Sequence, residues 1–417
     1  MANKEKAIYV YADWINGPPV LMGKLYVSAY RGKELFSFEY TKDWIRSTDA
    51  STIFDPDLQL YEGRQYAQDK PLFGVIEDSC PDRWGRLLMK RKEQMLARDE
   101  NRKPRALTES DFLLGVYDET RLGALRYSLK ENGPFLSSEK DLTVPPWTKL
   151  RTLESASLAF ESDEGSHEEK WLKLLLAPGS SLGGARPKAS VQAPDNSLWI
   201  AKFPSKNDEW NSGAWEAVVH DLALKCKLSV PEAKQETFSD TGSTFLVKRF
   251  DRAGNRRVHF SSAMALLGKT DGAGAEGTSY LDIASFIRSN GAAPKRDLKE
   301  LWKRIVFTMA VSNTDDHLRN HGFLLTKSGW VLSPMYDVNP DIYGNALSLF
   351  VNENDNTINF DLAIETAEYY DVSVHDARTT VTEIKKTINE NWRTLAADKG
   401  LGKNAVNRME PAFAIEY

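Results

Sequence analysis

"SNTDDHLRNHGF", residues 312–323, places two carboxylates, two histidines and two asparagines in one short polar stretch. It directly follows "LWKRIVFTMAV", residues 301–311, whose apolar residues recur at helical spacing. A solvated loop is one interpretation of so many ionisable groups at the end of a buried helix, and a reaction centre is the other. What else the chain supplies decides between them.

Composition limits the classes of protein that fit. A chain of 417 residues is too long for one simple core, so two or three domains or lobes are expected. The net charge of −5 argues against binding nucleic acid mainly through overall charge, although a local basic patch remains open. Cys80 and Cys226 lie far apart without metal-ligand spacing, and no apolar stretch is long enough to cross a bilayer. We therefore expect a cytoplasmic protein without membrane contact.

The first part of the chain predicts a strand meander followed by helices. Strands are expected within 6–14, 22–30 and 34–40, which are rich in aromatic and β-branched residues and separated by turn residues. Helical patterns follow at 79–96 and 107–117, the second with Thr108 and Asp111 as a capping pair. The polar, acidic stretch 161–170 is interpreted as a linker or exposed loop. We therefore predict a domain of 1–165, followed by lobes of 166–252 and 253–417.

A Gly- and Ser-rich loop, "APGSSLGGARPK" at 177–188, opens the more specific part of the chain. "KASVQA" (188–193) and "LWIAKF" (198–203) flank a turn and predict a β-hairpin. A helix is expected over 211–228, starting near Asn211 or Ser212, and a strand within 243–252. Most segments beyond 260 have helical patterns, including 297–311 with Asp297 as its expected cap.

These segments supply parts that phosphoryl transfer needs. Gly183 and Gly184 lack Cβ atoms, so the backbone of loop 180–188 could approach phosphate oxygens, although an ordinary Gly/Ser turn fits as well. Lys202 lies late in a strand, on a mostly apolar face, and would need a carboxylate partner if buried. Glu216, in the first turns of the next helix, could supply it. A lysine reaching water from the strand end is the plainer alternative.

The opening stretch, residues 312–323, supplies the remaining groups that phosphoryl transfer needs. Asp315 and Asn320 are five residues apart, and Asp337 follows in "SPMYDVNP". Protein kinases use this order for a catalytic aspartate, a metal-binding asparagine and a metal-binding aspartate. Carboxylate and amide oxygens are ligands that Mg²⁺ accepts. The spacing to Asn320 favours Asp315 over Asp316 as the catalytic residue. His317 and His321 could instead suggest zinc, but no cysteine is nearby.

Several motifs then resemble the HipA-type serine/threonine kinases of bacterial toxin–antitoxin modules. "PDRWGRLL" resembles the N-terminal region of that family. "SSLGGARPK", "LWIAKFP", "VKRFDR", "NTDDHLRNHGF" and "LSPMYDVNP" resemble its kinase core in the same order. The resemblance covers most of the chain. It implies an α+β, protein-kinase-like, bilobal fold with a strand-rich N-terminal domain and a mostly helical C-terminal lobe.

The resemblance also implies roles for residues. Asp315 would be catalytic, Asn320 and Asp337 would hold magnesium, and Ser181, next to Ser180, would be autophosphorylated. Residues that would bind ATP are Gly183, Gly184, Ala185, Arg186, Pro187, Lys188, Lys202, Lys248, Arg249, Phe250, His317, Leu318, Arg319, Asn320, Tyr336 and Asp337. Of these, Lys248, Arg249 and Phe250 would form the hinge around adenine, although Lys248 stands where the type member has an acidic residue.

The expected function is ATP- and magnesium-dependent phosphorylation of serine or threonine in a protein, with growth inhibition as a toxin. The implied partner is a helix-turn-helix antitoxin, through which the complex would reach DNA, and aminoacyl-tRNA synthetases are one implied substrate class. Two alternatives stay open. A D-x4-N…D arrangement also suits a small-molecule phosphotransferase, and a co-repressor subunit would not need the site at all.

Overall fold

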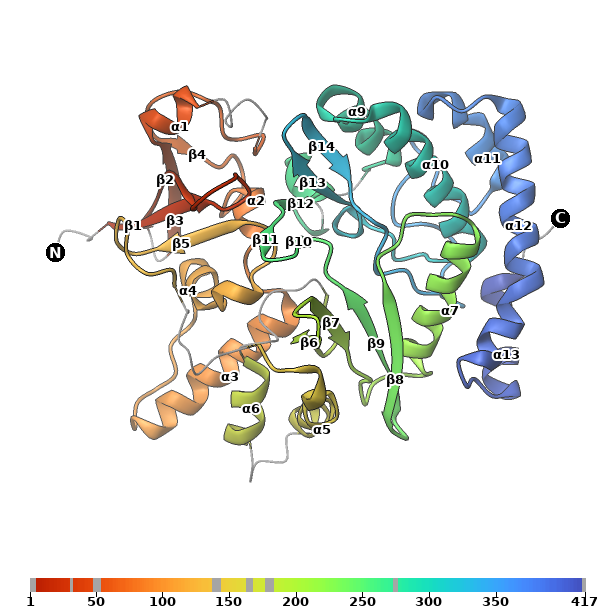
Figure 1. Cartoon of the computed structure of the whole chain (residues 1–417), viewed down its shortest axis with the longest axis horizontal. Helices are drawn as coiled ribbons and strands as arrows, with labels where there is room; N and C mark the ends of the chain where they lie inside the picture. Colours follow the sequence, from red (N-terminus) through yellow and green to blue (C-terminus); the bar gives the residue numbers. More distant parts are fainter. Residues whose placement is uncertain are drawn as a thin grey trace. The chain divides into compact units, whose positions relative to one another are not determined.

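The computed structural model describes residues 5–30, 33–47, 54–136, 144–162, 168–176, 184–272 and 277–414. The chain divides into two compact units, each assembled from separate segments (Figure 1). Unit 1 holds residues 1–206, 249–261 and 268–270, and unit 2 holds residues 207–248, 262–267 and 271–417. The predicted division at 165 and 252 stays a prediction.

Unit 1 begins with the strand meander that the sequence predicts. Its five-stranded antiparallel sheet has the order β4-β3-β2-β1-β5. The strands are β1 (Lys6–Ala12), β2 (Val20–Tyr30), β3 (Lys33–Tyr40), β4 (Gln65–Tyr66) and β5 (Leu125–Ser128). Ile8, Leu25 and Phe38 are fully buried on one face, so the alternation of apolar residues selects the side that meets the core.

The helices of unit 1 mostly follow the meander. They are α1 (Lys42–Arg46), α2 (Gly74–Glu77), α3 (Arg83–Asp99), α4 (Glu109–Gly115), η2 (Asp118–Thr120), η4 (Trp147–Lys149), α5 (Leu150–Glu161) and α6 (Glu168–Leu176). The capping box of Thr108 and Asp111 that the sequence predicts is present at α4. The linker interpretation of 161–170 is wrong at its end, because Glu168–Lys170 already belong to α6.

Two hairpins complete unit 1. β6 (Lys188–Gln192) and β7 (Leu198–Lys202) pair antiparallel, which confirms the predicted hairpin. β10 (Arg252–Ala253) and β11 (Arg256–Arg257) form a second, tighter one.

A buried ion cluster ties this second hairpin into unit 1. Asp251 accepts hydrogen bonds from the side chains of Arg249 (2.6 and 2.8 Å) and Arg252 (2.7 Å) and from the backbone N–H of Gly123 (2.8 Å). Arg249 also donates to the carbonyl oxygen of Thr120 at 2.7 Å. Removing one member of such a cluster would leave an uncompensated buried charge, so residues 249–257 are an integral part of unit 1.

Unit 2 is mostly helical, as expected beyond residue 260. Its helices are α7 (Ser212–Lys225), α8 (Ala263–Leu266), α9 (Tyr280–Asn290), α10 (Pro294–Ala310), η6 (Leu318–Asn320), α11 (Phe360–Glu365), η7 (Ala367–Tyr370), α12 (Val374–Asp398), α13 (Lys403–Met409) and η8 (Glu410–Phe413). Its hairpins are β8 (Ala233–Ser239) with β9 (Gly242–Lys248), and β13 (Gly322–Thr326) with β14 (Gly329–Leu332). β12 (Phe260–Ser262) lies where the chain passes between units.

Helix α12 packs against both α7 and α10 (Figure 1). The apolar stripes predicted for α7 and α10 are buried, and Trp302 and Ile305 are at most 1% exposed. The start of α10 differs from the prediction: Pro294 occupies the first turn, and Asp297 lies inside the helix. There, the Asp297 carboxylate accepts the backbone N–H of Leu332 at 3.0 Å, so it anchors β14 instead of capping the helix.

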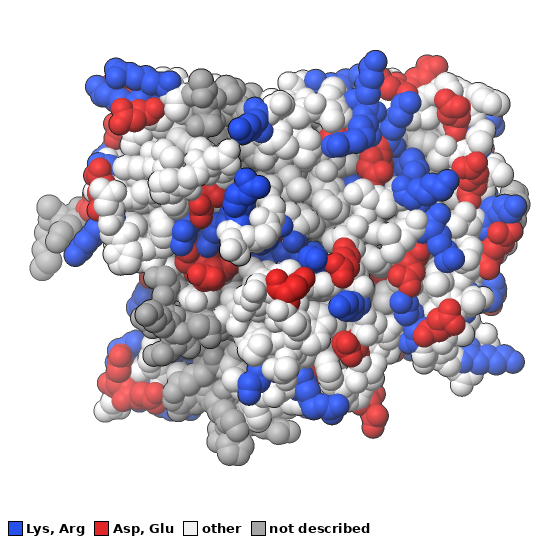
Figure 2. All heavy atoms as spheres, in the orientation of Figure 1, with Lys and Arg blue, Asp and Glu red and all other residues white. Residues whose placement is uncertain are grey.

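The surface of the molecule carries charges of both signs, as the composition predicts. Figure 2 shows basic and acidic side chains interspersed on one face of the molecule. No helix in the described part of the chain is long and apolar enough to cross a membrane. Cys80 and Cys226 are buried free thiols, and burial raises the pKa of each to about 12.

Candidate functional site

The polar stretch 312–323 begins where α10 ends, as its position in the sequence predicts. Ser312 adopts a left-handed conformation (φ 50°), and the backbone N–H of Asn313 donates to the carbonyl of Thr308 at 3.0 Å. This closes the C-terminus of α10 and turns the chain away from the helix axis. Leu318–Asn320 then form the short 3-10 helix η6. The stretch is therefore a tightly folded loop, fixed to a buried helix.

Asp315 and Asn320 lie at the two ends of this loop and are joined across it. The side-chain amide of Asn320 donates from Nδ2 to the backbone carbonyl of Asp315 at 3.0 Å. Between them, the backbone N–H of His317 donates to Asp315 and that of Asn320 to His317. Because Nδ2 is engaged within the loop, Oδ1 is the atom that Asn320 can offer to a metal ion.

Asp316 points the opposite way from the solvent-exposed Asp315 and is only 3% exposed. Its Oδ2 accepts from the hydroxyl of Tyr280 at 2.6 Å and lies 3.2 Å from Nε2 of His321. Burial would raise the pKa of Asp316, but the charge of His321 and the two hydrogen bonds outweigh burial and keep that pKa low. A buried, ionised Asp316 with two partners at Oδ2 supports the choice of Asp315 as the reactive carboxylate.

The segment after β14 approaches the loop from its other side. Asp337 has a left-handed backbone (φ 58°), a conformation that aspartate and asparagine tolerate better than most residues. The hydroxyl of Tyr336 donates to the carbonyl of Arg319 at 2.7 Å. Further along, the backbone N–H of Asp341 donates to Ser312 (3.0 Å), and its carboxylate accepts the hydroxyl of Thr314. Residues 336–341 are thus fastened to residues 312–319.

These contacts collect negative charge around Asp315. Burial raises the pKa of the Asp315 carboxyl, and the carboxylates of Asp337, Asp316 and Asp341 raise it further, whereas His317 lowers it. A divalent cation would relieve this repulsion, so the oxygen ligands present fit magnesium. Within the described ranges, no three His, Cys, Asp or Glu side chains form a metal cage of their own. Nucleotide phosphates and water would have to complete the coordination.

Except for Lys248, which belongs to unit 2, the predicted ATP-binding residues outside the 312–341 site belong to unit 1. Gly184 has φ +101°, which suits glycine, but Ser180, Ser181 and Gly183 lie outside the described residues. The ammonium of Lys188 is buried and pairs with Asp82 at 3.0 Å. Lys188 is therefore a structural cation of unit 1 as well as a predicted phosphate contact.

Arg186 and Lys202 also belong to unit 1. Nε of Arg186 donates to the carbonyl of Phe203 at 3.0 Å, which holds the end of the loop against the end of β7. Lys202 is half-buried, on the face of β7 that it shares with Leu198 and Ile200. Glu216 is buried in α7 of unit 2, so its pairing with Lys202 stays a prediction.

The three predicted hinge residues have different surroundings. Lys248 ends β9 in unit 2 and pairs with Glu232 at 3.1 Å. Arg249 is buried in the ion cluster of unit 1, which commits its side chain to structure and leaves only its backbone for a ligand. Phe250 packs its ring against Phe260.

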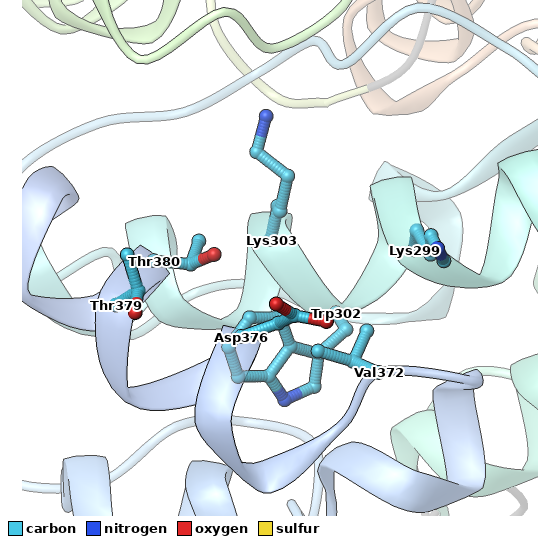
Figure 3. Close-up of a pocket in the computed structure, with 7 residues that line it drawn as sticks. All are labelled: Lys299, Trp302, Lys303, Val372, Asp376, Thr379 and Thr380. Carbon is cyan, nitrogen blue, oxygen red and sulfur yellow. The ribbon is translucent and has the colours of Figure 1, made fainter.

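Sequence reasoning missed two residues that shape this site. Asp341 was not considered, although it follows Asp337 by four residues in "DVNPD", and a second carboxylate so close to a metal-binding candidate was a usable signal. Tyr280 lies 36 residues before Asp316, and nothing in the local pattern indicates that the two meet. A cavity of about 270 Å³ in unit 2 lies elsewhere (Figure 3). It is lined by Lys299, Trp302, Lys303, Val372, Asp376, Thr379 and Thr380, none of them a predicted site residue.

Comparison with solved structures defines the fold. The chain superimposes on a chain of the Shewanella oneidensis MR-1 toxin–antitoxin complex of HipA, HipB and operator DNA with a TM-score of 0.68. The match covers 98% of this chain and 96% of that one, at 16% sequence identity. The expectation of an α+β, kinase-like HipA fold is confirmed.

The family follows from the sequence itself. The model of the HipA-like C-terminal domain matches residues 180–392, which include both the 312–323 loop and Asp337. The protein therefore belongs to the HipA-like family. A Haemophilus influenzae protein named "Putative kinase" is 30% identical over 206 residues, which are 43% of this chain. The match spans 60% of the length of that protein, less than two thirds.

Proposed function

We propose that this protein is an ATP- and magnesium-dependent serine/threonine protein kinase that acts as the toxin of a toxin–antitoxin module. One observation carries the proposal: unit 2 brings Asp315, Asn320 and Asp337 together on two segments that are hydrogen-bonded to each other. The family membership and the name of the Haemophilus relative favour phosphotransfer as the chemistry.

Each residue has a role under this proposal. Asp315 orients the attacking hydroxyl and accepts its proton, for which a carboxylate with a raised pKa is suited. Asn320, through Oδ1, and Asp337 hold magnesium, which neutralises charge on the transferred phosphoryl group when bound. Loop 183–188 and Lys202 contact the phosphates, Glu216 orients Lys202, and the backbone of residues 248–250 borders adenine.

A labelling experiment tests the activity. The purified chain is incubated with Mg²⁺ and γ-labelled ATP, together with a lysate of the host cell. Label on serine or threonine of a protein, absent with Asp315→Asn, supports the proposal. Label that appears only on a metabolite favours the small-molecule phosphotransferase instead. No transfer to any acceptor, from a folded protein that binds magnesium and ATP, would contradict both.

Autophosphorylation at Ser181 is part of the proposal. Ser181 lies in the loop 180–188 proposed to contact the phosphates, and a phosphate there would add about −1.5 to −2 charge. That charge would repel the phosphates of ATP and lower its affinity. Mass spectrometry after incubation with magnesium and ATP should find phosphate at Ser181, and should find none in the Asp315→Asn variant. Phosphate at Ser180 alone would move the assignment by one residue.

The partner would be a helix-turn-helix antitoxin, and only the complex would bind operator DNA. The Shewanella complex of HipA, HipB and operator DNA, which shares the fold, supports this assembly, and the net charge of −5 fits indirect DNA binding. Expression of the chain should arrest growth, co-expression of the antitoxin should restore it, and Asp315→Asn should be harmless. If Asp315→Asn arrests growth equally, the site is dispensable and the co-repressor alternative is favoured. A labelled aminoacyl-tRNA synthetase would identify one substrate class.

A further inference from the structure

The loop 312–323 contains the same spacing twice, shifted by one residue. Asp315 and Asn320 are five residues apart, and so are their next neighbours Asp316 and His321. The first pair is joined by a side chain-to-backbone hydrogen bond of 3.0 Å. The second pair is joined side chain to side chain, with 3.2 Å between Nε2 of His321 and Oδ2 of Asp316. Two links therefore close the loop, one beside the other: an outer rung of Asp315 and Asn320 and an inner rung of Asp316 and His321.

The two carboxylates have different surroundings, whereas Asn320, at 9% exposure, is buried like His321. Asp315 is exposed, whereas Asp316 and His321 are 3% and 2% exposed. An ionised carboxylate can only accept, so His321 donates to Asp316 from Nε2 and the hydroxyl of Tyr280 donates to the same oxygen. Hydrogen bonds to a buried carboxylate are among the stronger ones in proteins. The inner rung thus fixes the backbone positions from which Asp315 and Asn320 project.

Tyr280 is itself held rigidly. It is the first residue of α9, and Ser279 and Asp282 form a capping box around that helix end. Its backbone N–H donates to the carbonyl of Phe350 at 2.9 Å. Its ring meets the ring of His321 edge to face, with 5.6 Å between the centroids. The donor that reaches Asp316 is therefore anchored in α9, outside the loop.

We propose that Tyr280, Asp316 and His321 are positioning residues for phosphoryl transfer: together they hold Asp315 and Asn320 at their working separation without touching substrate or metal. The proposal rests on the proposed kinase function. Its general form is that a buried D-x4-H pair sets the geometry of the D-x4-N pair that starts one residue earlier.

Single-atom changes test the inner rung. Tyr280→Phe removes only the hydroxyl that donates to Asp316 and should lower kcat about tenfold, the scale for one hydrogen bond to a charged group. KM for ATP should change less than about twofold, because no group proposed to bind the nucleotide is altered. Tyr370→Phe is the matched control: this tyrosine is also buried in unit 2, but its hydroxyl has no hydrogen-bond partner among the described residues, so kcat should stay unchanged.

His321 offers a rescue test. His321→Gln keeps an N–H that can reach Asp316, whereas His321→Leu fills the space without a donor. Gln should retain most of kcat and Leu should lose it, with both variants folded by circular dichroism. Equal kcat in these two folded variants, or wild-type kcat in Tyr280→Phe, would refute the positioning role while leaving the proposed function intact.

Hydrogen exchange tests, independently of activity, whether the inner rung holds the loop in place. Amides within 315–321 should exchange faster in Tyr280→Phe than in Tyr370→Phe, while amides of α10 keep their rate. If the wild-type protein transfers no phosphate, the proposed function fails, but faster exchange in this loop still supports the inner rung. Unchanged exchange in Tyr280→Phe would overturn it.

Discussion

Asp315 is exposed and has three other carboxylates near it, so its substitution tests the proposed catalytic role directly. We expect Asp315→Asn to lower phosphoryl transfer by about 10²–10⁴-fold, the usual range for general-base assistance, while ATP binding is largely kept. Calorimetry and a transfer assay on one preparation separate the two effects. Asp316→Asn should be the milder change for transfer, and the opposite order would show that Asp316 is the catalytic carboxylate.

Asp337 joins a proposed role in metal binding to a left-handed backbone. At φ 58°, asparagine is tolerated and alanine is not, so the two substitutions separate charge from strain. Asp337→Asn removes the negative charge but keeps an amide oxygen, so it should weaken magnesium-dependent nucleotide binding at near wild-type stability. Asp337→Ala should lose the same binding and about 1 kcal/mol of stability in addition. Urea unfolding and magnesium titration measure these quantities, and magnesium-dependent binding retained by folded Asp337→Ala would exclude this carboxylate as a ligand.

Among single residues, the sequence predicted those whose spacing matches a known arrangement of catalytic and metal-binding groups. Asp315, Asn320 and Asp337 could be found because their order is set by what a metal ion and a hydroxyl require. Tyr280 could not be found, because its contact with Asp316 depends on how α9 packs against the loop. Their assigned roles stay predictions until the variants are measured.

Among the elements, α7 shows how tightly a helix and a strand can meet. A Cβ atom at Gly213, in the first turn of α7, would lie 2.0 Å from the backbone oxygen of Ser243 in β9. Asn211, the N-cap of α7, strengthens the same junction by accepting the backbone N–H of Ser243 at 2.8 Å. Two backbone segments touch here without a side chain between them.

Gly213→Ala is therefore expected to destabilise the protein, although replacing glycine by alanine within a helix usually stabilises it. Helix propensity alone would stabilise the protein by about 1 kcal/mol, but the collision with Ser243 should destabilise it by about 1–3 kcal/mol. Ser212→Ala, one residue earlier, changes propensity without the collision and serves as the control. Urea midpoints of the two variants give the comparison, and a stabilised Gly213→Ala would mean that α7 can shift away from β9.

Strong periodicity explains which elements could be predicted. β1, β2, β3, α7 and α10 have apolar residues at clear strand or helix spacing and were identified. β8 was missed because, in "AKQETFS", no residue is fully buried and the apolar signal is absent. The β13–β14 hairpin was missed within a region that otherwise looks helical. Asp297 was misplaced as a cap because Pro294 begins α10 one turn earlier.

For the whole molecule, the clearest prediction is a loss of folding stability as the pH falls. His259 of unit 1 stacks against both Trp14 and Phe54, and burial lowers its pKa from 6.5 to about 3. Between those values the unfolded chain binds a proton that the folded chain does not, so stability falls as the pH falls below 6.5. At about pH 5 the expected loss is about 2 kcal/mol.

His259→Phe isolates this effect, since a phenyl ring can keep both stacking contacts. Its loss of stability between about pH 7.5 and pH 5 should be smaller than that of the wild type by about 2 kcal/mol. Below about pH 4 both proteins should weaken together, because Asp118 and Asp251 have lowered pKa values and lose their ion pairs on protonation. Parallel curves between pH 7.5 and 5 would show that His259 is protonated in the folded protein.

The separate segments of unit 1 have a consequence for how the protein is made. Residues 1–206 leave the ribosome before the 249–261 segment that supplies Asp251, Arg249 and His259 to the same unit. At about 5–20 residues per second, the 55 residues from 207 to 261 take roughly 3 to 11 s to synthesise. During that interval the ring faces of Trp14 and Phe54 and the N–H of Gly123 lack their final partners. The nascent chain must therefore wait in an incomplete state, which is where chaperone binding and aggregation would compete with folding.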